Sequence, residues 1–195
     1  MKRIILASAL ASFTITGYAN EAAERNVKFG FILGAGFGGD SIQEFEFDDG
    51  STDSVDAGGG LFFGASVQSR VYQASDLPID AKFGFSYMFD SVSASNGDAS
   101  FSRFPIDLIL MSQIANISFG AGMTYHLNPE YELDLDGSSG TLPFDDALGT
   151  KFELNYHFEQ SPQTSMGIEY TSITYDSFIG ERDGSCISIT LKGLY

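Results

Sequence analysis

The chain has 195 residues, of which 43% are hydrophobic and only 18% are charged, with 22 Gly, 18 Phe, one Cys and no Trp. This length allows one domain or two small ones, and the aromatic content argues against a disordered chain. One cysteine excludes a disulfide framework and thiolate metal clusters. The 26 acidic residues far outnumber the 10 basic ones, which excludes nucleic acid as a partner, because phosphate binding needs a basic face.

Residues 1–19 have the three parts of a secretory signal peptide. Met1-Lys2-Arg3 is basic, Ile4 to Gly17 is uncharged and apolar, and Gly17-Tyr18-Ala19 has small residues at the positions that a signal peptidase recognises. The alternative is an uncleaved anchor, but the apolar run is short and rich in Ser, Thr and Ala. We predict cleavage after Ala19 and one domain over residues 20–195.

Large apolar residues alternate with small or polar ones in segment after segment of the remaining chain. Only a strand sends successive side chains to opposite faces, so this period of two predicts strands. The uncharged stretch Leu108–Pro129 is long enough for a membrane helix, but it has a polar interruption at residues 112–116 and alternates after it. The alternating segments are 27–37, 61–71, 80–89, 103–110, 117–127, 148–158, 166–174 and 186–195.

The composition of the two strand faces decides the fold class. One face carries Phe, Leu, Ile and Tyr without charge, and the other is rich in Gly and Ser, as at Gly30, Gly34, Gly120 and Gly122. A sandwich in water would place larger polar residues on its solvent face, whereas a narrow barrel needs small residues inside. Because a membrane excludes open sheet edges, we predict an all-β, membrane-spanning, eight-stranded antiparallel up-and-down β-barrel in the outer membrane of a Gram-negative bacterium.

The connections between these segments alternate in length. Long or medium connections follow the odd-numbered segments, over residues 38–57, 90–100, 128–147 and 176–185, and each contains a turn dipeptide such as Asp49-Gly50 or Asp183-Gly184. Short connections lie between them, over residues 73–78, 112–116 and 159–165. This is the outer-membrane pattern of extended outside loops and tight periplasmic turns.

The signal peptide, the eight alternating segments and the terminal run ISITLKGLY resemble the small outer-membrane barrels of Gram-negative bacteria, of the OmpX/Ail opacity/adhesin type or like the OmpA transmembrane domain. In that group the assembly machinery recognises a last strand that ends in an aromatic residue. The resemblance implies this role for Tyr195, Leu191, Ile189 and Ile187, with Gly193 a weak member. It also implies a monomer in contact with outer-membrane lipids and lipopolysaccharide.

Most of the acidic residues fall on the expected outside loops, where Arg182 is the one basic residue. They are Asp40, Glu44, Glu46, Asp48, Asp49, Asp53, Asp56, Asp90, Asp98, Glu130, Glu132, Asp134, Asp136, Asp145, Asp146, Asp176, Glu181 and Asp183. Carboxylates are ligands for Ca²⁺ and Mg²⁺, so we hypothesise weak, diffuse cation binding. Glu132, Asp134 and Asp136 resemble the start of an EF-hand loop, but Pro143 stands where its terminal Glu should be.

Charged residues also fall on the small-residue face, which is the barrel interior. They are Lys28, Arg70, Asp80, Lys82, Arg103, Asp107, Lys151, Glu153, Glu169 and Lys192. Because an unpaired buried charge is costly, we expect these groups to form ion pairs that fill the lumen. A gated pore is the alternative.

The sequence offers little for catalysis or a cofactor. His126 and His157 are expected at opposite ends of the barrel, and neither is followed closely by a Ser on its strand, so they cannot form one hydrolytic site. We therefore expect no enzyme and no cofactor. The favoured function is adhesion, shielding or ligand interaction by acidic surface loops, the runner-up is a narrow ion or small-solute pore, and a lipid-modifying enzyme comes third.

Overall fold

The computed structural model describes residues 27–46, 52–73, 77–94, 97–135 and 138–195. Cleavage of residues 1–19 stays a prediction, since that segment lies outside the described residues, as do Asp48, Asp49 and Asp136. In the described ranges all regular elements are strands, and no helix there is long and apolar enough to cross a membrane.

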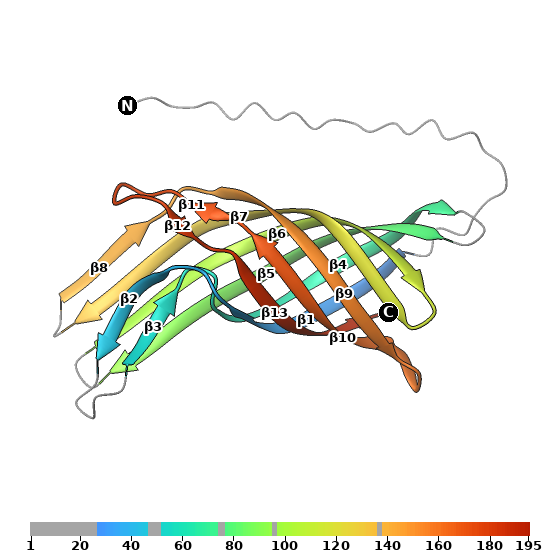
Figure 1. Ribbon diagram of the computed structural model, residues 1–195, viewed down its shortest axis with the longest axis horizontal. Coiled ribbons are helices and arrows are strands. Elements are labelled where there is room, and N and C mark those ends of the chain that lie inside the picture. The colour runs from blue at the N-terminus through green and yellow to red at the C-terminus, as the bar shows by residue number, and fades with distance from the viewer. Residues whose placement is uncertain (1–26, 47–51, 74–76, 95–96, 136–137) are drawn as a thin grey trace.

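Eight antiparallel strands close into a barrel, which confirms the predicted fold (Figure 1). Each strand pairs with the next along the chain, and the last pairs with the first, from Gly30 opposite Leu194 to Phe37 opposite Ile187. The barrel strands are β1 (Val27–Phe37), β4 (Gly60–Gln73), β5 (Pro78–Ala94), β6 (Gly97–Ile114), β7 (Ile117–Leu135), β9 (Ala147–Phe158), β10 (Ser161–Ser172) and β13 (Cys186–Leu194).

The two faces of these strands have opposite surroundings, as the alternation predicted. On β1, Phe29, Phe31 and Leu33 point outward and are 64%, 50% and 56% exposed, whereas the interior side chains Glu153 and Thr190 are buried. A continuous apolar outer surface of this kind must be shielded from water. A closed barrel leaves no second protein layer for that purpose, so hydrocarbon covers this belt.

The longest strands run on past the belt at the end opposite the C-terminus (Figure 1). The segments 90–100 and 128–147, which were expected as outside connections between strands, are themselves mostly strand. Strands β5, β6 and β7 continue through most of those segments, and β8 (Ser138–Pro143) pairs with β7. The other outside connections hold the hairpin of β2 (Ser41–Glu46) and β3 (Thr52–Asp56) and the short pair β11 (Thr174–Tyr175) and β12 (Arg182–Asp183).

An apolar core explains why these segments are ordered strands. Buried side chains of the projecting strands and of the connections beside them pack together, and we call this group the outer cluster. It consists of Val55, Ala57, Val92, Ala99, Phe101, Tyr131, Phe144, Ala147, Ile173 and Tyr175. Phe101 lies at its centre, with ring centroids 5.5 Å from Phe144 and 5.6 Å from Tyr175. The projecting sheet therefore has a hydrophobic core of its own.

The terminal strand shows why Gly193 interrupts the apolar pattern of ISITLKGLY. Ile187, Ile189, Leu191 and Tyr195 are exposed on the outside, whereas Gly193 is covered by the ring of Phe31 from β1. A Cβ atom at Gly193 would lie 2.3 Å from that ring. The Phe31 ring also stacks on the ring of Tyr195, with the two ring centroids 6.2 Å apart. The Phe31 ring thus fills the gap that the glycine leaves. Recognition by the assembly machinery stays a prediction.

Candidate functional site

Charged side chains of five strands meet inside the barrel at the level of the belt. Strand β9 supplies four alternate inward residues, Lys151, Glu153, Asn155 and His157, because period two sends them all to the same face. Long side chains fit in this narrow lumen because their neighbours are small. In the strand register, Gly122 lies opposite Lys151, Gly120 opposite Glu153, Gly84 opposite Asp107 and Gly167 opposite Asn155.

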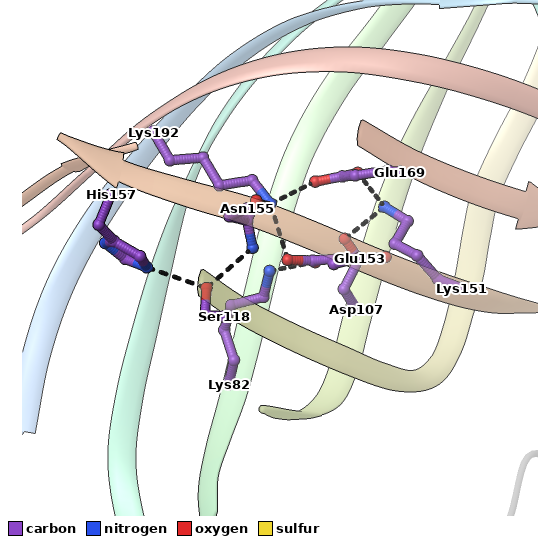
Figure 2. A network of polar contacts seen from close by, with 9 residues as sticks. All are labelled: Lys82, Asp107, Ser118, Lys151, Glu153, Asn155, His157, Glu169 and Lys192. Carbon is purple, nitrogen blue, oxygen red and sulfur yellow. Dashed lines mark hydrogen bonds and ion pairs between the residues drawn. The ribbon is translucent and has the colours of Figure 1, made fainter. Parts of the chain in front are cut away.

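Three lysines and three carboxylates form one continuous network, shown in Figure 2. Lys192 Nζ lies 2.7 Å from both Glu153 Oε2 and Glu169 Oε1. Lys151 Nζ lies 2.7 Å from Asp107 Oδ2 and 3.4 Å from Glu169 Oε2, and Lys82 binds the second oxygen of Glu153. Glu153 and Glu169 are directly opposite each other on β9 and β10, a repulsive arrangement that Lys192 bridges.

Three more of the predicted interior charges, at two places, lie apart from this network. Arg70 and Asp80 pair with each other near the periplasmic turns, where the Arg70 side chain is 34% exposed. Lys28 is exposed at the start of β1, and no ion pair of Lys28 occurs among the described residues. Both sites are open to solvent at the barrel end, so neither carries the cost of a buried charge.

Arg103 departs from the expectation that the interior charges pair. It is only 1% exposed, yet none of the carboxylates in the described ranges forms an ion pair with it. Its Nη2 donates to the carbonyl oxygen of Gly59 at 2.9 Å, and its guanidinium lies 4.9 Å from the centre of the Phe101 ring. Arg103 therefore sits between the network and the outer cluster.

The lumen is closed at its outer end. A cavity of about 60 Å³ lies among the residues of the ion-pair network and extends toward His157 and the periplasmic side. On the outer side of the network come Arg103 and then the apolar side chains of the outer cluster. Such a cavity holds a few water molecules at most, and paired polar side chains occupy the lumen around it at membrane level.

Two of the three candidate metal ligands lie on a strand and not on a curled loop. Glu132 and Asp134 are exposed on β7, an extended strand whose alternate side chains are roughly 7 Å apart, and Asp136 lies outside the described residues. Asp98 of β6 lies directly opposite Asp134. In the described part of the chain no three His, Cys, Asp or Glu side chains gather as a metal site would require.

The histidines lie at opposite ends of the interior, and each has a partner that the sequence did not show. His126 Nδ1 contacts the hydroxyl of Tyr175, and burial raises the pKa of Tyr175 to about 12, so this phenol stays protonated. His157 Nε2 lies 2.9 Å from Ser118 Oγ of β7, and its Nδ1 lies 3.1 Å from the carbonyl oxygen of Pro162. The sequence places no Ser close after His157 on its own strand, and the partner Ser118 comes from the neighbouring strand β7.

The Ser118–His157 pair differs from a hydrolytic site in two ways. Its third partner is a backbone carbonyl and not a carboxylate, and Ser118 is buried inside the lumen, where it also accepts a hydrogen bond from Asn155 at 3.3 Å. Lipids lie outside the barrel wall. The pair therefore ties β7 to β9 above the periplasmic turn.

Among the solved structures that align with this chain are bacterial surface and outer-membrane proteins. Ail of Yersinia pestis, in complex with the heparin analogue sucrose octasulfate, aligns with a TM-score of 0.48 and 8% identity over 87% of this chain and 96% of that one. Neisserial surface protein A aligns with a TM-score of 0.45 and 12% identity over 86% and 96%. AlkL in lipid bilayers aligns with a TM-score of 0.41 and 10% identity over 92% and 95%.

These likenesses concern the fold alone. No protein-family model matches the chain, and no curated protein matches it in sequence. The closed barrel of eight strands, its apolar outer belt and its polar, ion-paired lumen are features of this chain itself. Together they make it a small eight-stranded β-barrel protein of the Gram-negative outer membrane.

Proposed function

We propose that this barrel acts through its extracellular part, in surface interaction, adhesion or envelope shielding. The observation that carries the proposal is the outer cluster, which closes the lumen and supports a sheet projecting beyond the belt. A protein that only conducts solutes has no need of an ordered projecting sheet. The plugged lumen and the projecting sheet both favour a function at the outer surface.

The charge of the projecting sheet indicates the kind of ligand. Glu132 and Asp134 of β7 and Asp98 of β6 are exposed carboxylates, and Asp98 and Asp134 are direct cross-strand neighbours. Like charges in such a position repel, and a cationic ligand relieves that repulsion. We therefore expect positively charged partners to bind, together with Ca²⁺ or Mg²⁺ in a diffuse manner.

Removal of the β7–β8 hairpin tests this proposal without touching the belt. The Phe144 amide already donates to the Pro129 carbonyl at 2.8 Å, so residues 130–143 can be replaced by an Asn-Gly turn. Cells bearing the shortened protein should adhere less to a polylysine-coated surface and lose their response to millimolar Ca²⁺. Unchanged adhesion, serum survival and cation response at equal surface expression would contradict the proposal.

Charge variants sharpen the same test. The substitutions Asp98→Asn and Asp134→Asn keep the sheet and remove the opposed carboxylates, so adhesion to polylysine should fall while the barrel remains folded. Asp80→Asn is the matched control, because Asp80 lies at the periplasmic end. An equal loss of adhesion in the control would show that the effect does not come from the surface charge.

A narrow pore is the second candidate function, and conductance measurements separate it from a surface function. We expect no reproducible conductance steps in planar bilayers, since the network and the outer cluster block the path. Steps that disappear on altering Lys151 or Glu153 would favour the pore and count against a structural plug.

We also expect no lipid-modifying activity, and the Ser118–His157 pair provides the test. Overexpression of the protein should leave the mass spectrum of lipid A and phospholipids unchanged, and Ser118→Ala should behave in the same way. A modified lipid that appears with the parent protein and is absent with Ser118→Ala would overturn this expectation.

A further inference from the structure

The buried guanidinium of Arg103 has donors without acceptors. Its Nη2 binds the Gly59 carbonyl, and one planar face lies over the Phe101 ring, but Nε and Nη1 have no hydrogen bond of good geometry among the described residues. The phenol of Tyr175 is a hydrogen-bonding neighbour of the guanidinium, but it is neutral and also contacts His126. Ring stacking satisfies the face of a guanidinium and leaves its edge N–H groups unpaired. A buried arginine in this state requires a further acceptor.

Charged groups lie on both sides of Arg103, but none of the described carboxylates forms an ion pair with it. Below it, three lysines and three carboxylates neutralise one another in the network described above. Above it, Asp90 of the neighbouring β5 accepts the amide of Asp56 at 2.8 Å, and no ion pair between Asp90 and Arg103 occurs in the described ranges. Arg103 therefore holds a buried positive charge that none of the described carboxylates contacts, which is costly in a low dielectric.

A small cavity lies where an acceptor would be needed. It measures about 20 Å³ and is lined by Arg103, His126, Lys151 and the hydroxyl-bearing Ser86, Thr171 and Ser188. Glu169 also borders it, but that carboxylate is held by Lys151 and Lys192. A cavity of roughly 10–15 Å³ already holds one water-sized particle. The space suits one or two such particles and excludes phosphate or a larger anion.

We propose that this cavity binds one small monovalent anion of the halide class, represented by chloride, held by Nε and Nη1 of Arg103. The hydroxyl groups of Thr171 and Ser188 supply further donors, and the anion neutralises the interior. The ion is a structural counter-charge between the lumen network and the outer cluster. The site is independent of the proposed surface function, so failure of either leaves the other standing.

Bromide in place of chloride tests the site directly. The protein is refolded in detergent with sodium bromide, so that the ion can enter before the barrel closes, and crystals are measured at the bromine edge. We expect one anomalous peak between Arg103 and Thr171. Ordinary density for water without anomalous signal, at saturating bromide, would overturn the proposal.

Stability measured against anion type gives a second, independent test. At constant ionic strength, replacing gluconate by chloride should raise the thermal midpoint of the parent protein in proportion to the logarithm of chloride concentration above the Kd. The rise should disappear in Arg103→Met and persist in the control Lys28→Met, whose target residue is an exposed lysine. Equal responses of all three proteins would show a general salt effect and refute the site.

A conservative variant covers the case in which Arg103→Met does not fold. Thr171→Val keeps the shape of the side chain and removes a lining hydroxyl, so the midpoint should respond several-fold more weakly to chloride. A response as large as that of the parent protein would contradict the assigned ligands.

Discussion

The belt-level lumen and the outer cluster lie end to end in one barrel and are built in opposite ways. The lumen is held together by ion pairs such as Lys192 with Glu153, whereas the outer cluster contains apolar rings such as Phe101 and Phe144. The difference follows from what lies outside each region. Hydrocarbon around the belt takes up the large apolar side chains, which leaves polar residues for the interior. Beyond the belt the outer surface meets water, and the apolar residues turn inward.

The two regions fill the inside of the barrel in different ways. Ion pairs in a narrow lumen are directional, so each charge depends on its particular partner, and removal of one leaves another unpaired. An apolar cluster is non-directional and adapts better to the loss of one member. Variants in the two regions should therefore differ in both the size and the extent of their effects.

The largest effect is expected for Glu153→Ala in the lumen network. The change leaves Lys82 and Lys192 without their shared carboxylate, and removal of one partner of a buried ion pair costs about 3–5 kcal/mol. Urea unfolding of the detergent-folded barrel, followed by circular dichroism, measures the loss. The control Asp80→Asn removes a partly exposed pair and should cost less than about 1 kcal/mol. Equal losses would show that burial of the network contributes nothing.

A smaller and more local effect is expected for Phe101→Ala in the outer cluster. Phe101 is fully buried against Phe144 and Tyr175, and such a truncation costs roughly 3 kcal/mol. Hydrogen exchange should become faster at the outer ends of β6 and β7 and stay slow in the belt. Faster exchange throughout the barrel would show that the two regions unfold as one unit.

An intermediate loss is expected where the belt meets the terminal strand. Gly193→Ala places a methyl group against the Phe31 ring, and overpacking of this kind costs about 1–3 kcal/mol. Gly140→Ala is the matched control, since no atom lies within 4 Å of a Cβ there. Urea unfolding of both variants decides the point, and a neutral Gly193→Ala would mean that Phe31 can move aside freely.

The smallest effect is expected at Asp183, in the outer connection before β13. Hydrogen bonds from the hydroxyl and amide of Ser185, the latter at 2.9 Å, lower the pKa of Asp183. A lowered carboxylate pKa stabilises the connection at neutral pH, and the contribution is lost as the pH falls below about 4. Amide exchange near Ser185, corrected for its intrinsic pH dependence, should show this loss. Asp183→Asn should remove the pH dependence, and a variant with unchanged dependence would contradict the assignment.

Much of the fold follows from local pattern. Segments such as Val27–Phe37 and Ile117–Leu127 alternate so regularly that strand, face and membrane exposure can be deduced from period and composition alone. The outer extension could not be found in this way. Its apolar residues Val92, Ala99 and Tyr131 are spaced among acidic and small ones, and their common burial depends on neighbouring strands.

The candidate site, too, was only partly predictable from the sequence. Which charges face the lumen depends on residue parity, a local property, so Lys82, Glu153 and Lys192 were identified from the sequence. Which of them touch depends on strand register and stagger around the closed barrel, a property of the whole sheet. For that reason only the tertiary structure separated Arg103 from the paired charges, brought Ser118 to His157 and set the outer cluster over the lumen.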